Sequence, residues 1–579
     1  MDQRTTSSLF RALQRTEASS GLVLRTRKAG AAEAAEGQGV RQLKVLETKK
    51  RKHTSPAAIV RRKRQKSSEP SCGDFARLPH EVIEQILLQC NASSLGALSC
   101  TSSYFSASGI IERVALKLLR CTSRGLLIQQ TPGETAAYLL HFVMQSEQVA
   151  VQSKKFALGS FHSAVLTDCP ETLEGALYTF GRGFHGQLGH GGYDNSSVPL
   201  RVTLDVGSKE AVKEEVILDS DLKMVALGGS HCAALTHCGT LYTWGLASSG
   251  ELGHGGWTPI EVDVPRPVTS LGKVRVEMVA AGSNHTLAVG TCGGLWSCGR
   301  GRHGQLGQGH YHDVGPLQRV ESLRGIDVAS ASAGGGHSMV LTPEGKVWAW
   351  GDNRDGQLGL GMRGADVGLP WPHRVEVPHH HGSGSRSRQQ GFFSVSTGGH
   401  HSLLVTMNGE LLACGRARHG ALGIDSKSNK RTPTRVDIGS LTEDMPCAAC
   451  SQCARGKCRV VQAVAGGSHS LVVTACGEVR GAGCNAYGQL GLGDTTQRRA
   501  FTPIPAAQKA GLWGLAAGDD HSAAVGIDNK MYLWGRGDWG QLGLPDGRGH
   551  WLPQRLDGLI LGEIRDESDS EGQLDDEGY

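Results

Sequence analysis

Seven histidines stand in one recurring phrase, Gly-x-x-His-Ser/Thr, and imidazoles in such a pattern could bind a metal ion or transfer protons. Only Cys232 departs from the hydroxyl residue at the fifth position. A catalytic base is needed once, whereas a side chain present in every repeat is expected to be a buried imidazole that bridges backbone groups of neighbouring strands. We therefore interpret these residues as structural. They are His162, His231, His285, His337, His401, His469 and His521.

A second pattern that could hold a metal is a CxxCxxCxxxxC run of four cysteines. Four thiolates can bind zinc tetrahedrally, but this spacing asks one short loop to surround the ion and lacks two separated cysteine pairs. We expect a flexible, redox-sensitive loop without a cofactor, and zinc is the alternative. No nucleophile turn, phosphate loop or paired carboxylate accompanies these patterns, so we predict that the chain is not an enzyme. The cysteines are Cys447, Cys450, Cys453 and Cys458.

A second phrase, Gly-Gln-Leu-Gly, alternates strictly with the histidine phrase and also occurs seven times. A period of roughly fifty residues or more, with short apolar runs beside each phrase, predicts four short β-strands per repeat. The glycines suit tight loops with positive φ, and the leucine can fill the gap between blades. We therefore predict a mainly β, seven-bladed propeller. The second phrase starts at Gly186, Gly250, Gly304, Gly356, Gly420, Gly488 and Gly540, with Glu251 and Ala421 replacing the glutamine.

On these two phrases the chain resembles the regulator-of-chromosome-condensation (RCC1) repeat proteins over residues 155–560, which implies the same seven-bladed propeller. We expect the ring to close through the strand from Leu552 to Leu556, which would complete the blade that begins near Phe156. Three gaps between a second phrase and the next first phrase span about 40 residues, against fewer than 30 in the other three. Equivalent junctions open on one face of a propeller, so that face is predicted to bind partners.

Charge is segregated at the two ends of the 579-residue chain, although its net charge is only +5. Residues 1–70 hold 17 Lys and Arg against 6 Asp and Glu, whereas residues 562–579 hold 8 acids and one Arg. Such polar stretches bury too little apolar surface to fold, so residues 1–72 and 561–579 are predicted to be disordered tails. No apolar run is long enough to cross a bilayer, and no membrane partner is expected.

Two basic clusters in the first tail resemble a bipartite nuclear localisation signal. The alternatives are a solvated charge run, an arm that contacts nucleic-acid phosphates, or an organellar transit peptide between Ser7 and Lys28. We expect the protein in the nucleus, with the cytoplasm as a further location. The clusters are Lys49, Lys50, Arg51 and Lys52, and Arg61, Arg62, Lys63 and Arg64.

Residues 73–150 are predicted to form a small all-α domain, because proline at a helix start is followed by apolar residues at helical spacing. The run from Leu78 to Leu87 resembles an F-box, the module that docks on the S-phase-kinase-associated adaptor of cullin-RING ubiquitin ligases. The resemblance implies that Leu78, Pro79, Ile86 and Leu87 lie on or beside the adaptor surface. The alternative is an unrelated helical cap for the propeller.

Together these features favour an interaction adaptor, in which the F-box-like domain engages the ligase adaptor and cullin while the propeller selects a protein substrate. A second hypothesis is a chromatin-associated exchange factor for a small GTPase, similar to the founding member of the repeat family, or a non-enzymatic nuclear scaffold. An ultraviolet-B photoreceptor is disfavoured, because no tryptophan stands within the histidine phrases.

Overall fold

The computed structural model describes residues 110–120, 134–168, 175–202, 222–255, 260–362, 368–376, 391–438 and 458–561, together with 83, 84, 87, 88 and 128. The chain divides into two compact units. The first comprises residues 1–126 and 134–141, and the second comprises residues 127–133 and 142–579.

Helices make up the described part of the first unit. Helix α5 (Ile110–Arg120) buries one apolar side, and the carboxylate of Glu84 accepts a hydrogen bond from Arg113 Nε at 3.0 Å. Glu112 Oε1 accepts a hydrogen bond at 2.8 Å from the backbone N–H of Ala136, at the start of α6 (Ala136–Gln152). This bond satisfies one of the free N–H groups at the start of α6. Leu87 is fully buried, whereas Leu78, Pro79 and Ile86 lie outside the described residues.

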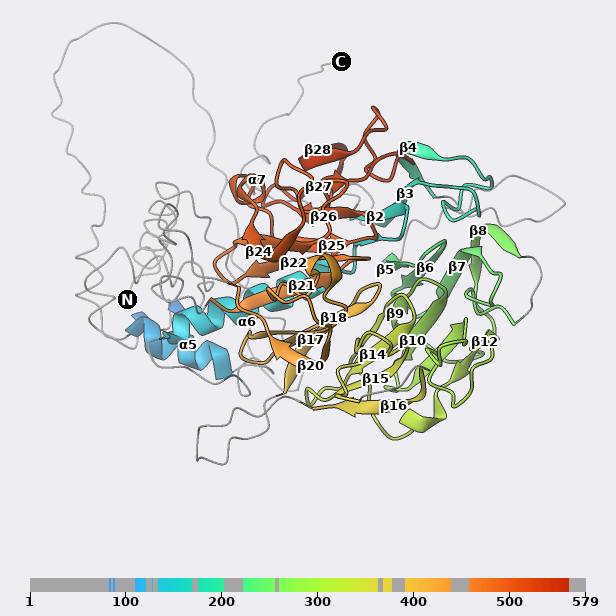
Figure 1. Cartoon of the computed structure of the whole chain (residues 1–579), viewed down its shortest axis with the longest axis horizontal. Helices are drawn as coiled ribbons and strands as arrows, with labels where there is room; N and C mark the ends of the chain where they lie inside the picture. Colours follow the sequence, from blue (N-terminus) through green and yellow to red (C-terminus); the bar gives the residue numbers. More distant parts are fainter. Residues whose placement is uncertain are drawn as a thin grey trace, which may run out of the picture. The chain divides into compact units, whose positions relative to one another are not determined.

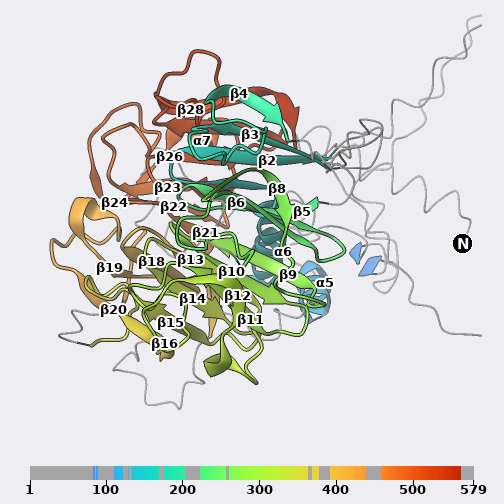
Figure 2. The same cartoon turned by 90° about the vertical axis from the view of Figure 1, so that its right-hand side faces the viewer.

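The second unit is built from seven four-stranded antiparallel sheets, each formed from consecutive strands (Figures 1 and 2). This arrangement confirms the predicted mainly β, seven-bladed propeller. The first three blades are β1 (Phe156–Leu158), β2 (His162–Asp168), β3 (Gly175–Gly181) and β4 (Ser196–Arg201); β5 (Leu222–Leu227), β6 (His231–Thr236), β7 (Leu241–Leu246) and β8 (Glu261–Pro267); and β9 (Val276–Ala281), β10 (His285–Gly290), β11 (Leu295–Gly299) and β12 (Val314–Arg319).

The fourth and fifth blades are β13 (Ser330–Ala333), β14 (His337–Leu341), β15 (Val347–Gly351) and β16 (Leu369–Val375); and β17 (Phe392–Thr397), β18 (His401–Thr406), β19 (Leu411–Gly415) and β20 (Lys430–Arg435). The sixth and seventh are β21 (Val460–Ala465), β22 (His469–Thr474), β23 (Val479–Gly483) and β24 (Arg498–Pro503); and β25 (Gly514–Ala517), β26 (His521–Val525), β27 (Lys530–Gly535) and β28 (His550–Ile560). Short helices η2 (Glu321–Leu323), η3 (Arg418–Gly420) and α7 (Pro505–Lys509) occupy connections.

The ring closes by packing between the first and seventh blades and not by a shared sheet. Strand β28 pairs with β27, and β1 pairs with β2, so the predicted mixed blade is wrong. The innermost strands β1 and β25 lie in contact instead. Phe156 and Val165 of the first blade share one hydrophobic cluster with Leu533 and Leu556 of the seventh.

The two phrases lie at the same end of every blade, because strands alternate in direction and the phrases form the β1–β2 and β3–β4 connections of each sheet. We call this end of the ring the upper face. The opposite, lower face carries the connections from each fourth strand to the next first strand. The strands that flank the three long connections, 203–221, 377–390 and 439–457, end and begin at this face, and the connections themselves lie outside the described residues.

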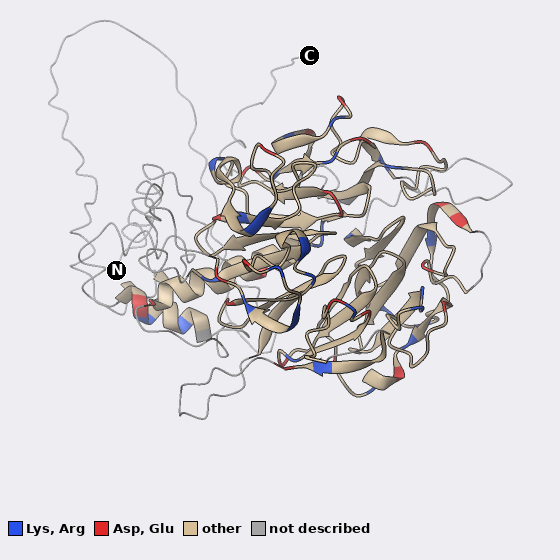
Figure 3. Ribbon diagram, in the orientation of Figure 1, with Lys and Arg blue, Asp and Glu red and all other residues tan. Residues whose placement is uncertain are grey.

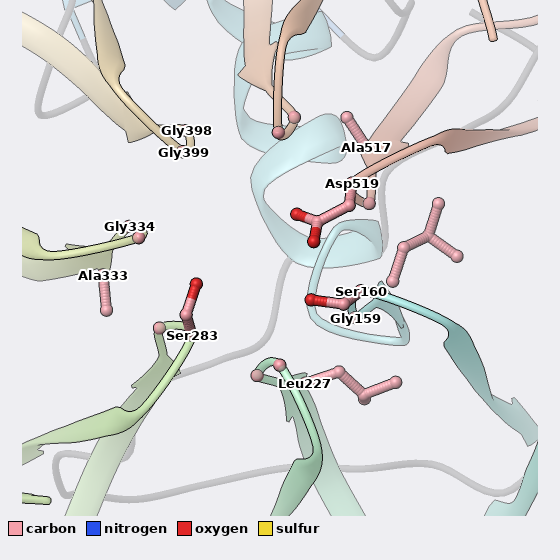
Figure 4. Close-up of a pocket in the computed structure, with 18 of the residues that line it drawn as sticks. Gly159, Ser160, Leu227, Ser283, Ala333, Gly334, Gly398, Gly399, Ala517 and Asp519 are labelled. Atoms are coloured by element: carbon pink, nitrogen blue, oxygen red, sulfur yellow. The ribbon is translucent and has the colours of Figure 1, made fainter. Parts of the chain in front are cut away.

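The second-unit part of α6 crosses the lower face. The Phe142 ring lies 6.2 Å from that of Phe393 in the fifth blade. At the other end, the carbonyl of Lys154 accepts a hydrogen bond at 3.0 Å from the N–H of Val225 in the second blade. Figure 4 shows this helix behind the central opening. Among the described residues, no helix has the length and apolar character needed to span a membrane.

Candidate interaction face

The seven histidines form a ring of side-chain bonds that join each blade to the next. His162 Nε2 lies 3.1 Å from Cys232 Sγ, and the other six lie 2.8–3.0 Å from a hydroxyl oxygen. The bonded pairs are His162–Cys232, His231–Thr286, His285–Ser338, His337–Ser402, His401–Ser470, His469–Ser522 and His521–Ser163. The last pair joins the seventh blade to the first.

The direction of these bonds follows from the third partner. Ser163 Oγ donates to the carbonyl of Gln541 at 2.7 Å, and each of the other six hydroxyl or thiol groups donates to the carbonyl of the second residue in a Gly-Gln-Leu-Gly phrase. The Ser163 proton is thereby used, so His521 Nε2–H must donate to Ser163 Oγ. The histidines therefore bridge blades through side chains, whereas we had expected backbone partners.

Burial keeps these imidazoles neutral. All seven are buried, and desolvation lowers the pKa of each from its usual 6.5 to about 3 or about 4. Their shared geometry and neutral state agree with the structural interpretation.

Glycine opens the phrase because blades approach closely there. A Cβ on Gly159 would lie 2.5 Å from the carbonyl oxygen of Gly228 in the next blade. Backbone bonds between phrases run around the ring, for example from Gly229 N to Ser283 O at 3.1 Å. The result is a narrow central cavity of about 80 Å³ lined by the phrases (Figure 4).

The second phrase is a rigid loop. Gly186 has φ of 71°, and Gln187 Oε1 accepts a hydrogen bond from His185 N at 2.8 Å. Leu188 is buried, as predicted for a residue that fills the gap between blades. Trp244 of the next blade is fully buried, and its Nε1 donates to the Gln187 carbonyl at 3.0 Å. Because these loops are rigid, they also fix the backbone of the residues that directly precede each Gly-Gln-Leu-Gly phrase.

Residues that differ between repeats surround this scaffold on the upper face. In every blade the residue after the third strand's last glycine donates its N–H to the carbonyl of the residue before the histidine, as Arg182 does to Phe161 at 2.9 Å. The residues at this donating position are Arg182, Leu246, Arg300, Asp352, Arg416, Cys484 and Arg536. Basic and acidic residues are interspersed along the propeller ribbon, as Figure 3 shows.

A cavity of about 420 Å³ opens beside the centre of the upper face, and we call it the axial cavity. Arg354 donates two hydrogen bonds to the Asp352 carboxylate, from Nε at 3.0 Å and from Nη2 at 2.8 Å. Burial disfavours the ionised form of Asp352, but the hydrogen bonds from Arg354 outweigh this effect and lower the pKa of Asp352. The titratable residues of the cavity wall are His303, Asp352, Arg354, His400, Asp519 and Asp520.

Asp519 places a carboxylate where the other phrases have glycine or serine. Figure 4 shows it pointing into the central opening, with Ser160 and Ser283. Burial raises the pKa of Asp519, and burial together with the neighbouring Asp519 raises that of Asp520. The Asp519 side chain is half-buried on this face.

An alternating stack of rings and guanidinium groups crosses the sixth, seventh and first blades on the same face. The Arg182 Cζ lies 4.9–5.6 Å from three ring centroids, and the Arg536 Cζ lies 4.6 and 5.6 Å from two, with one ring shared. Such distances are within the range of cation–π attraction. We call this the arginine–aromatic ladder; it consists of Tyr487, Arg536, Phe161, Arg182, Phe184 and Trp539. The sequence patterns did not lead us to predict this ladder.

The predicted metal and localisation residues are mostly outside the described part of the chain. Cys458 is described, and its Sγ donates to Cys476 Sγ at 3.1 Å, whereas Cys447, Cys450 and Cys453 are not described. Within the described residues, no three His, Cys, Asp or Glu side chains cluster as metal ligands would. Both basic clusters, 49–52 and 61–64, also lie outside.

Seven four-stranded blades, each with both phrases at equivalent turns, define an RCC1-type propeller. A family model for the RCC1-like domain matches residues 142–456, and RCC1 repeat models match residues 460–489, 477–525 and 528–565. The chain belongs to the RCC1 repeat family.

Relatives of different kinds share this propeller. The chain is 27% identical to the ultraviolet-B receptor UVR8 of Arabidopsis thaliana over 72% of its length and 85% of the relative's. It is 32% identical to the mitochondrial RCC1 domain-containing protein RUG3 of the same plant, over 62% of its length and 70% of that protein's. It is also 32% identical to the human E3 ubiquitin-protein ligase HERC2, of whose length it spans only 6%.

Solved structures resemble the chain in fold. Human WBSCR16 has a TM-score of 0.52 at 22% identity, over 64% of this chain and 87% of that one. Yeast RCC1 (Prp20), solved with bound Kap60, has a TM-score of 0.53 at 19% identity, over 71% of this chain and 86% of that one. At these identities the likeness shows the fold alone.

Proposed function

We propose that the chain is a non-catalytic interaction adaptor whose propeller binds a protein partner through the upper face, and not through the lower face, for which the long connections had led us to predict binding. The observation that carries this proposal is the division of each turn into a repeated scaffold and residues that differ from blade to blade. Aromatic and arginine side chains are enriched at protein interfaces, and the ladder exposes them on a rigid surface. Phe184 is 44% exposed and Tyr487 is 39% exposed.

The finer form of the proposal is a substrate-recognition subunit of a cullin-RING ubiquitin ligase, in which the helical unit engages the S-phase-kinase-associated adaptor. Support comes from the F-box-like run at Leu78 to Leu87 and from relatives named as E3 ubiquitin-protein ligases that carry a similar propeller in a longer chain. Leu87 is buried in the first unit, so Leu78 and Ile86 are the residues we would change.

Co-purification of the full-length chain from cells tests the two surfaces separately. Leu78→Asp with Ile86→Asp should remove the ligase adaptor and cullin but leave propeller partners bound, because burying an unpaired carboxylate at an interface costs several kcal/mol. Phe184→Asp, on the upper face, should do the reverse. A wild-type chain that never retains the ligase adaptor contradicts the ligase role. Loss of every partner in both variants contradicts the proposal that the two surfaces bind independently.

A second candidate is a nuclear binding protein for a small GTPase or chromatin. Prp20p of Saccharomyces cerevisiae has been described together with its binding to Gsp1p and histones, and the chain shares its fold. The two candidates differ in one measurement. Nucleotide release from a purified Ran-type GTPase should be unchanged by this chain if the adaptor proposal is correct, and accelerated if the chain is an exchange factor.

A further inference from the structure

Aromatic rings hold the guanidinium group of Arg182 in place. Phe161, Phe184 and Trp539 surround it, with ring centroids 5.6, 4.9 and 5.3 Å from Cζ. Its buried Nε has no hydrogen-bond partner, and no carboxylate among the described residues lies within ion-pair distance of it. The rings therefore hold the guanidinium group in one orientation, and because Arg182 is half-buried, its Nη groups are the donors left to bind an acceptor from outside.

Arginines occupy the equivalent position in three other blades, and a comparison with them shows how the contacts of Arg182 differ. Arg416 pairs with Asp355 at 2.8 Å, and Arg536 pairs with Asp520 and Asp538. Arg300 has the same backbone bond to the histidine phrase, but no aromatic ring stacks on it in the described part of the chain. Arg182 alone among these four combines stacked rings with the lack of a described acidic partner.

Two further exposed apolar side chains lie on the outer strands of the seventh and first blades, the blades that also carry Trp539 and Arg182. Trp551 of β28 is 52% exposed, and it lies against the Gly488 loop that precedes the sixth blade's fourth strand. Leu200 of β4 is 44% exposed, and Ser197, at the start of the same strand, lies against the Gly540 loop. An exposed aromatic ring beside a preset cation, as Phe184 is beside Arg182, is characteristic of an interaction site.

We propose, on the basis of the interaction function above, that the arginine–aromatic ladder binds an acidic segment of a partner protein. One carboxylate of that segment occupies the fork of Arg182, where Arg and carboxylate form paired hydrogen bonds. Apolar residues beside the acid pack on Phe184 and Trp539. Charge complementarity selects this occupant over a second copy of the chain, because a two-fold contact centred on the ladder would place Arg182 opposite its own equivalent.

The test is fluorescence anisotropy of the full-length chain with a short labelled peptide of alternating glutamate and leucine, compared with the same peptide carrying glutamine for glutamate. We expect binding of the glutamate peptide only, and a loss of about tenfold or more in affinity for Arg182→Gln, since charge-assisted bonds to arginine are strong. Trp539→Ala should also weaken binding, without any change of charge. Arg182→Lys should fall between wild type and Arg182→Gln, because lysine lacks the planar fork.

Arg300→Gln is the matched control, since it removes one arginine at the same position of another blade. It should bind the glutamate peptide as the wild type does. Equal losses in Arg300→Gln and Arg182→Gln would mean diffuse charge attraction and overturn the proposal, as would equal binding of both peptides or of neither. A wild-type dimer that Arg182→Gln dissociates, measured by light scattering, would show a second copy as the occupant.

The peptide test is separable from the interaction function itself. If Phe184→Asp removes a co-purified partner while the glutamate peptide fails to bind, the upper face still binds proteins and only the acidic chemistry is wrong. If neither variant nor peptide has an effect, both proposals fail. Thermal unfolding of every variant shows whether the propeller is intact.

Discussion

Two sets of residues share each Gly-x-x-His turn and behave in opposite ways. The histidine is buried and makes the same bond in all seven blades. The two residues before it face the central opening and the upper face, and they range from glycine to Phe161, His400 and Asp519. Adjacent positions of one turn therefore serve different purposes.

Repetition therefore identifies the scaffold, and departure from repetition identifies the proposed binding surface. A buried donor that loses its acceptor costs free energy of unfolding, so each histidine is constrained by the next blade. The facing residues touch solvent, and substitutions there cost little stability unless a specific contact is lost. Variants on either side of this division should separate stability from binding.

The largest expected effect is unfolding in mild acid. Each ring histidine has a pKa of about 3 or 4 in the fold against 6.5 when unfolded, so the unfolded chain binds more protons between those values and stability falls as pH decreases from 6.5 to 4. Each histidine lowers the free energy of unfolding by up to about 1.4 kcal/mol for each pH unit of acidification, or roughly 10 kcal/mol per unit for the seven together.

Tryptophan fluorescence during acid titration measures this loss. A sum of that size exceeds the usual stability of a domain, so cooperative unfolding is expected above pH 4. His312→Gln, an exposed position outside the ring, should leave the midpoint unchanged. A propeller that remains folded at pH 4 would contradict the neutral ring.

The next effect concerns the junction where the two ends of the propeller meet. His521→Ala removes the bond to Ser163 and leaves a cavity, and we expect a loss of about 2–4 kcal/mol in free energy of unfolding. His469→Ala, the matched variant between the covalently connected sixth and seventh blades, should lose less. Denaturant unfolding compares them, and a larger loss for His469→Ala would argue against a weak closing junction.

Much of the scaffold was predictable because its chemistry repeats. Seven copies of two phrases indicated the blade number, the buried imidazoles and the interblade leucines such as Leu188. The histidine partner was not predictable, since His521 bonds Ser163 across 358 positions of sequence. The closing strand was misassigned because Leu552 to Leu556 looks like any fourth strand, and sequence alone does not tell which blade it joins.

The candidate site was less predictable, since its residues follow no period. Arg182, Tyr487 and Trp539 are far apart in sequence and meet only because equivalent loops of three blades converge. One signal was available: arginine follows the third strand's last glycine in four of the seven repeats, at a position where scaffold chemistry requires no charge. The helical unit offers no such repetition, so its function stays a prediction.

A smaller effect is expected at the single departure within the ring. Cys232 accepts from His162 at 3.1 Å and donates to the Gln187 carbonyl at 3.1 Å, although sulfur is a weak acceptor and donor. Cys232→Ser restores the hydroxyl used in the six other blades and should stabilise by up to about 1 kcal/mol, whereas Cys232→Ala should destabilise by a similar amount. Thermal unfolding distinguishes them, and equal effects of Ser and Ala would mean that the bond contributes nothing.

The smallest effect lies on the other side of the division, at Asp519→Ser. Burial raises the pKa of this carboxyl in the folded chain, so the unfolded chain loses its proton first as pH rises. The stability that the protonated carboxyl contributes is therefore lost as pH rises through the folded pKa. At neutral pH the ionised group opposes folding, and serine, already present at Ser160 and Ser283, should stabilise by less than about 1 kcal/mol because the site is half-exposed. The gain should vanish below the usual pKa of aspartate, near pH 3, where both states are protonated. Denaturant unfolding at neutral and acidic pH measures it. A loss of several kcal/mol at neutral pH would place Asp519 among the scaffold residues and break the separation between the repeated and the divergent halves of the turn.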